Sequence, residues 1–153
     1  MDEQNEEFTP EELAYNPFAP QPRGKALIRV TGVLLIIFGI FSITVSLIGL
    51  ISSIKANSDA GIIITVYFEL VVAACAFGAG IGSVKNAGVA AKAQGIIVLG
   101  IILCALRVID LILGLAIFRL SAGGNIFILA AVGFVLSVLL IIGGLMNKKG
   151  APV

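Results

Sequence analysis

The sequence has no histidine and no tryptophan, and its two cysteines, Cys75 and Cys104, both lie inside apolar segments. Histidine is the side chain best suited to proton transfer near neutral pH and the commonest metal ligand, so both roles lose their usual residue. Two isolated cysteines give neither a disulfide framework nor the spacing of a zinc site. Phosphate loops and serine-nucleophile motifs are absent from the sequence as well. We therefore expect no enzyme, no catalytic residue, no cofactor and no metal site.

Charge is also scarce. Charged residues make up 12% of the 153 residues, whereas a soluble domain carries about 25%. Hydrophobic residues make up 59%, and a chain of this length cannot hide such an excess from water in one small core. The net charge of +1 gives no reason to expect nucleic acid as a partner. The lipid bilayer is the expected surrounding.

Four apolar stretches cover residues 30–54, 61–84, 93–118 and 125–146. Each is long enough to cross about 30 Å of hydrocarbon as a helix at 1.5 Å per residue. Membrane strands would show shorter segments of alternating polarity, and these stretches are continuous. The pattern predicts an all-α integral membrane protein with a membrane domain at residues 27–147.

The links between the four stretches are short, which favours an up-down-up-down order and hence an antiparallel four-transmembrane-helix bundle. Basic residues in short flanks mark the cytoplasmic side. One side would carry Arg23, Lys25, Arg29, Lys85, Lys92, Lys148 and Lys149. The other side would carry only Lys55 and Arg119. We therefore expect a multi-pass protein of the cell membrane with both termini in the cytoplasm.

The segment before the first helix, residues 1–26, is acidic and contains four of the five prolines between Pro10 and Pro22. Its composition predicts a cytoplasmic tail that is mostly disordered. One interpretation is a docking peptide for a partner, with apolar anchors at Phe8, Leu13, Tyr15 and Phe18. The other is a solvated leader. Residues 148–153 form a second, short cytoplasmic tail.

Small residues recur at the spacings that allow transmembrane helices to approach closely. The first stretch has Gly32, Gly39, Ser46 and Ser53 every seven residues. The second has two such runs, 74–78–82 and 76–80, and the fourth has Gly133 and Ser137 four apart. Packing inside one bundle and pairing between copies both explain these seams.

Three ionisable residues lie well inside the apolar stretches: Glu69, Arg107 and Asp110. Each costs roughly 2.5–3.5 kcal/mol at the centre of a membrane helix, so pairing should matter. Arg107 and Asp110 are three apart and share a helix face. Counting from the helix ends puts all three at roughly 12–17 Å below the outer boundary. We expect Arg107 to be shared by the two carboxylates, because a guanidinium can bind both.

The cluster has two interpretations. Intramembrane charges often mark an ion pathway or a proton relay. A salt-bridged triad that fixes the register of the helices would serve assembly alone. Little polar lining surrounds the three residues in the sequence, and no stretch contains a proline that would signal a broken-helix binding site.

The Ile-, Leu- and Gly-rich texture of RVTGVLLIIFGIFSITVSLIGL resembles that of small, uncharacterised four-transmembrane-helix proteins of bacterial membranes. That resemblance implies a fold and no specific activity. Four helices with an intramembrane glutamate are also similar in architecture and size to the small multidrug resistance transporters. In that family the glutamate lies in the first helix among aromatic residues, whereas Glu69 lies in the second and is accompanied by an arginine.

The function expected from these features is structural or accessory, with helices held by the small-residue seams and by the Glu69, Arg107 and Asp110 cluster, and a tail that docks a partner. The alternative is a small oligomeric transporter coupled to protons or cations through Glu69 or Asp110. A homo-oligomer or another membrane protein is the expected protein partner in either case.

Overall fold

The computed structural model describes residues 24–118 and 125–149. It contains four long helices: α2 at Lys25–Lys55, α3 at Ala60–Asn86, α4 at Ala93–Phe118 and α5 at Asn125–Lys149. A short 3-10 helix, η1, lies at Ala90–Lys92. The predicted all-helical architecture with four long apolar helices is confirmed, and each helix is long and apolar enough to cross a membrane.

The observed bounds extend the predicted ones by one to five residues at five helix ends, most of all at the start of α2 and the end of α5. Helix α2 begins at Lys25 instead of residue 30, because residues 25–29 contain no proline and include the apolar residues Ala26, Leu27 and Ile28. Helix α5 continues three residues beyond the predicted end at residue 146. Predictions about the tails at residues 1–23 and 150–153, and about Arg119, fall outside the described residues.

Helix α2 ends in a hydrogen-bonded turn that reverses the chain into α3. Asn57 has a φ of 49°, in the left-handed region that asparagine tolerates better than most residues. The Ser58 amide donates to the Ser53 carbonyl at 3.0 Å, and the Asn57 amide donates to the Ile54 carbonyl at 3.2 Å. This pairing satisfies two of the carbonyls left free at a helix end. The link to α3 is therefore short, as the sequence predicted.

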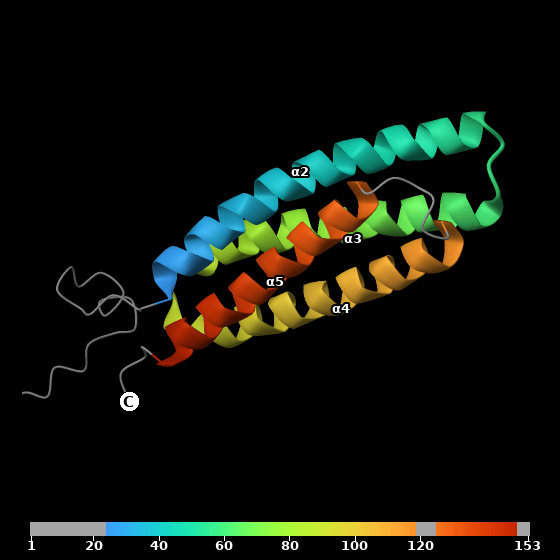
Figure 1. Ribbon diagram of the computed structural model, residues 1–153. Coiled ribbons are helices and arrows are strands. Elements are labelled where there is room, and N and C mark those ends of the chain that lie inside the picture. The colour runs from blue at the N-terminus through green and yellow to red at the C-terminus, as the bar shows by residue number, and fades with distance from the viewer. Residues whose placement is uncertain (1–23, 119–124, 150–153) are drawn as a thin grey trace, which may run out of the picture.

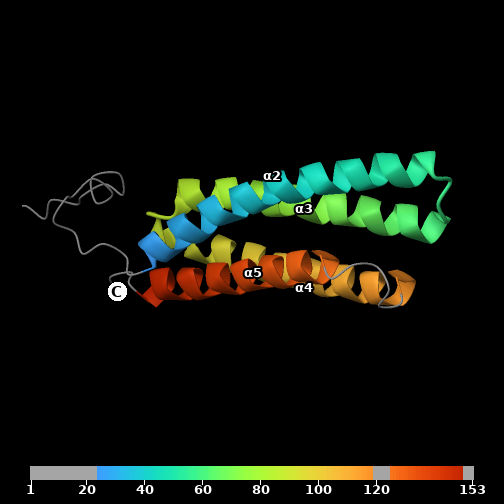
Figure 2. The same ribbon diagram turned by 45° about the horizontal axis from the view of Figure 1, so that its top comes forward.

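The four helices lie side by side along a common long axis (Figure 1). Helix α2 lies against α3 over most of its length, and α4 lies against α5 (Figures 1 and 2). Helix α2 also touches α5 near its start, where Gly24 and Ile28 contact Gly143. Toward its end α2 moves away from α5 (Figure 2). All the buried residues of α2 accordingly fall between Ile28 and Ser46.

The interior is mainly apolar and is built by all four helices. A single cluster of buried side chains comprises Ile28, Leu35, Phe38, Ala76, Ala79, Ala87, Ile96, Leu103, Leu136 and Leu140. The outward-facing side chains are also apolar, and large examples from each helix are Ile37, Ile48, Ile64, Ile101, Ile112, Val135 and Ile142. A helix that is apolar on its outer side as well as on its inner side is typical of a helix in a hydrocarbon surrounding.

Candidate functional site

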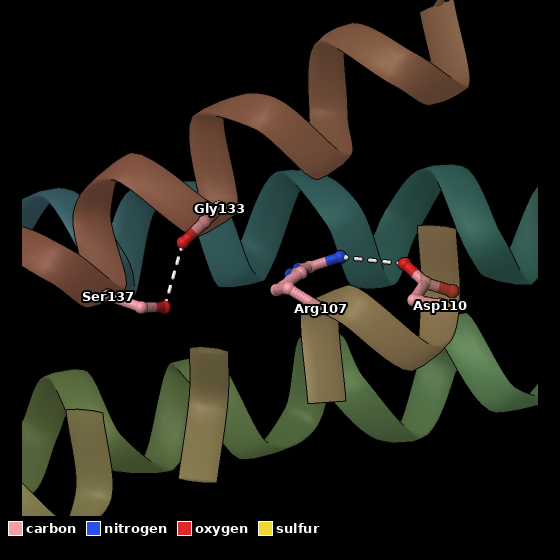
Figure 3. A network of polar contacts seen from close by, with 4 residues as sticks. All are labelled: Arg107, Asp110, Gly133 and Ser137. Atoms are coloured by element: carbon pink, nitrogen blue, oxygen red, sulfur yellow. Dashed lines mark hydrogen bonds and ion pairs between the residues drawn. The ribbon is translucent and has the colours of Figure 1, made fainter. Parts of the chain in front are cut away.

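The centre of the interior holds an ion pair within α4. The Nη1 group of Arg107 donates to Oδ2 of Asp110 at 3.2 Å (Figure 3). The two side chains are 2% and 8% exposed. Their three-residue spacing places them on one face of the helix, where such pairs meet. The structure thus brings together two of the three residues that the sequence singled out.

Arg107 is enclosed by residues from two further helices. Its guanidinium carbon lies 5.2 Å from the ring centroid of Phe38 in α2, a cation–π arrangement. On the other side it lies against the backbone of Gly133 in α5 (Figure 3). A Cβ atom at position 133 would come within 2.6 Å of Nε and 3.1 Å of Cζ of Arg107. One charged side chain therefore joins α2, α4 and α5.

Gly133 also accepts a second polar contact. The hydroxyl of Ser137 donates to the Gly133 carbonyl at 2.8 Å, one turn earlier in α5 (Figure 3). Ser137 is buried, 1% exposed. The sequence had marked Gly133 and Ser137 as a close-approach seam, and the structure puts this seam against the polar residues of α4.

The guanidinium of Arg107 is not fully used. Its Nη2 group is buried and has no hydrogen-bond partner among the described residues. A buried donor without a partner is costly, so this atom is a place where a further acceptor would be favourable. Of the other two guanidinium nitrogens, Nη1 is paired with Asp110 and Nε lies against Gly133.

Glu69 does not provide that acceptor in this structure. It is half-buried on α3, and among the described residues it forms no hydrogen bond or ion pair with Arg107. It nevertheless lies close enough to Asp110 and Arg107 to interact electrostatically with both. The expected fork, with Arg107 shared by two carboxylates, is thus formed only on the Asp110 side.

The small-residue runs separate into packed and unpacked ones. Gly32 meets Gly80 and Val84 of α3, and Gly39 meets Phe77, so the seven-residue seam of α2 faces α3. Gly80 belongs to the 76–80 run, which is buried. The run 74–78–82 faces outward instead, since a Cβ at Gly78 or Gly82 would meet nothing within 4 Å. Of the two interpretations of the seams, packing within the bundle is therefore not observed for Gly78 and Gly82.

A shallow hollow on α5 is lined by Ala131, Val132, Val135 and Leu136. Its lining is apolar and does not include Arg107 or Asp110. Across residues 24–118 and 125–149, no group of three or more histidine, cysteine, aspartate or glutamate side chains comes together as a metal site would require.

Phe38 and Gly133 are the two residues of the site that sequence reasoning did not assign to it. Phe38 is one of many phenylalanines in apolar stretches, and Gly133 stood only as one member of a seam. Gly133 could have been assigned to the site from the space that a buried arginine side chain requires. The size of a guanidinium requires a small residue on a facing helix at the same depth.

Searches of protein-family models, of curated proteins and of solved structures found no match to this chain. The site is therefore interpreted from its own geometry.

Proposed function

We propose that the chain is an integral protein of the cell membrane, arranged as an antiparallel four-helix bundle with both termini in the cytoplasm. The apolar outer surface supports the membrane location, because apolar side chains cover each helix on the outside. Lys25, Arg29, Lys85, Lys92 and Lys148 sit at or near helix ends on one proposed side, and Lys55 sits on the other. This asymmetry supports the cytoplasmic assignment of the first side.

The order of the helix contacts supports the antiparallel arrangement. Going forward along α2, Gly32, Gly39 and Gly49 contact residues of α3 that go backward, namely Val84, Phe77 and Val66. The same reversal occurs between α4 and α5, where Gly100 contacts Ile141 and Arg107 contacts Gly133. Short links between consecutive helices are compatible only with this alternation.

The proposed role is structural or accessory: a stable bundle that presents its cytoplasmic tail to a partner. The observation that carries this role is the enclosure of Arg107. The guanidinium is 2% exposed and is held by Asp110, Phe38 and Gly133. A charge held so closely by three helices would fix how they pack against one another.

A second candidate function rests on Glu69, which is half-buried and has no ion-pair partner among the described residues. A carboxylate of this kind within a membrane helix is a candidate for carrying a proton or a cation. Four helices enclose little space, so transport would require several copies. The two functions differ in whether the protein moves charge across a bilayer.

Flux through liposomes decides between them. The purified full-length protein is reconstituted with a pH-sensitive dye inside, and a proton or sodium gradient is imposed. We expect the wild-type rate to equal that of protein-free liposomes. A rate well above this background that disappears in Glu69→Gln, while the variant keeps its helical circular dichroism, would replace the structural role by transport. The matched control is Val71→Leu, because Val71 lies two residues after Glu69 on α3 and its side chain is exposed on the outside of the bundle.

The proposed tail contact has its own test. A photo-crosslinking residue is placed at Phe18 and, as the control, at Val33, whose side chain is exposed on the outside of α2. We expect a discrete protein adduct from position 18 and none of the same mass from position 33. Deletion of residues 1–22 should leave the unfolding midpoint of the bundle unchanged. Adducts of equal pattern from both positions would contradict a docking role for the tail.

A further inference from the structure

In the part of the chain that the structure describes, two buried hydroxyl groups of α2 differ from those of α3 and α5. Thr65, Ser83 and Ser137 each donate to the carbonyl four residues earlier, at 2.7–2.9 Å. Ser42 and Ser46 are as deeply buried, 0% and 2% exposed, yet their Oγ atoms have no partner within residues 24–118 and 125–149. A helix offers every serine a backbone acceptor, so these two hydroxyls are turned away from it. Each leaves an oxygen available in the interior.

Ser46 and Glu69 occupy facing positions on α2 and α3. The contacts of Gly39 with Phe77 and of Gly49 with Val66 bracket this part of the helix pair. Ser46 follows Gly39 by seven residues and so shares its face, while Glu69 follows Val66 by three. Glu69 also lies four and eleven residues before Ala73 and Gly80, both buried, so it belongs to the interior face of α3.

Ser42 and Asp110 extend this group toward α4. Phe38 and Arg107 are in contact, and Ser42 and Asp110 each follow them by about one helical turn. In the antiparallel arrangement proposed above, α2 and α4 run in the same direction, so both residues lie one turn further along on the same side. Asp110 interacts electrostatically with Glu69. Ser42, Ser46, Glu69 and Asp110 therefore lie within about two helical turns of one another along the inward faces of α2, α3 and α4.

The charge of this group is unbalanced. Two carboxylates and one guanidinium leave a net charge of −1 in an apolar surrounding when both acids are ionised. A buried net charge is expensive, and one bound monovalent cation would cancel it. Carboxylate and hydroxyl oxygens are the ligands that hard cations prefer. A divalent ion would leave an excess of +1 beside Arg107.

We propose that Ser42, Ser46, Glu69 and Asp110 form a binding site for one alkali cation, of which Na⁺ is the probe. The two serine oxygens and a carboxylate from each of α3 and α4 are the ligands. The cation would hold the far part of α2 and α3 to α4, where α2 no longer touches α5. The proposal rests on the antiparallel arrangement, and it holds whether or not the protein moves ions across the membrane.

The test is the thermal unfolding of full-length protein in detergent as NaCl replaces choline chloride at constant ionic strength and pH. Choline is too large for such a site and controls for screening. We expect a saturable rise in Tm, roughly 2–4 °C when Na⁺ exceeds its Kd about fivefold. Ser46→Ala and Glu69→Gln should each abolish the rise. Ser52→Ala, an exposed serine of the same helix, should retain it.

Three outcomes would overturn the site. The first is a Tm that does not depend on Na⁺ in the wild type. The second is a rise retained in Ser46→Ala and Glu69→Gln. The third is a Tm that responds to pH and not to Na⁺, which would mean that the group takes a proton instead. If Glu69→Gln does not fold, the serine variants decide. Because no gradient is used, failure here leaves the liposome result of the proposed function unaffected.

Discussion

Arg107 and Gly133 are complementary across the interface of α4 and α5: the guanidinium occupies the space that any side chain at position 133 would fill. A Cβ there would lie 2.6 Å from Nε of Arg107. The glycine is thus required by the arginine and not by the backbone geometry of α5, which is a regular helix at this point.

Gly133→Ala should therefore destabilise the bundle. The added methyl group displaces a guanidinium that is also held by Asp110, and overpacking of this kind costs about 1–3 kcal/mol. Unfolding of the purified variant by SDS titration in mixed micelles measures the loss. Gly78→Ala is the control, because its Cβ meets nothing within 4 Å. Equal stability of the two variants would contradict the contact.

Removal of one partner of the ion pair should cost more than removal of both. Asp110→Asn leaves Arg107 buried and charged, which is expected to lower the free energy of unfolding by about 3–5 kcal/mol. The double variant Arg107→Met with Asp110→Leu buries no charge and should recover most of that loss. The measurement is a double-mutant cycle in the same SDS titration. Simple additivity of the single changes would show that the two residues do not interact.

Phe38→Leu should weaken the contact between α2 and α4. Leucine keeps an apolar side chain but loses the ring face below the Arg107 guanidinium, at a cost of about 0.5–2 kcal/mol. Phe41→Leu serves as the matched change, because Phe41 is on the same helix and is 56% exposed. Thermal melts followed by circular dichroism compare the two. If Phe41→Leu is the more harmful variant, the assignment of Phe38 is incorrect.

Gly80→Ala should disrupt the close approach of α2 and α3. Its Cβ would lie 2.8 Å from the Gly32 carbonyl oxygen and 2.9 Å from the Ile36 amide nitrogen, both backbone atoms that cannot turn aside. We expect a loss of at least about 1 kcal/mol. Gly82→Ala, two residues away with open space around it, should be neutral or gain up to about 1 kcal/mol from helix propensity. The opposite ranking of the two Tm values would be incompatible with the observed contact.

The existence and length of the helices could be predicted from the sequence, because long continuous apolar runs have few alternatives. The contact between Arg107 and Asp110 was also predictable, since residues three apart in a helix meet whatever surrounds them. For these features the information is local. The start of α2 could not be predicted as closely, because Lys25 and Arg29 interrupt the apolar run although Ala26, Leu27 and Ile28 between them are apolar. Hydropathy marks the extent of an apolar stretch, and a helix can continue through charged residues beyond it.

The partners of Arg107 on other helices could not be predicted in the same way. Depth counting predicts Glu69 near the level of the pair, but depth says nothing about lateral distance or about how α2 crosses α5. Similarly, the runs 74–78–82 and 76–80 are equivalent as sequence patterns. Only the rotation of α3 about its axis makes one of them buried and leaves the other open to the outside.

The uneven burial along α2 has a dynamic consequence. Its buried residues end at Ser46, so residues 47–55 contribute little to the common interior. Local opening is easiest where few buried contacts must be broken, and amide hydrogens there exchange with solvent through small openings instead of global unfolding. The amides near Lys55 should therefore exchange earlier than those near Leu35. Disassembly of the molecule would begin at the turn around Asn57 and reach the contact of Ile28 with Gly143 last.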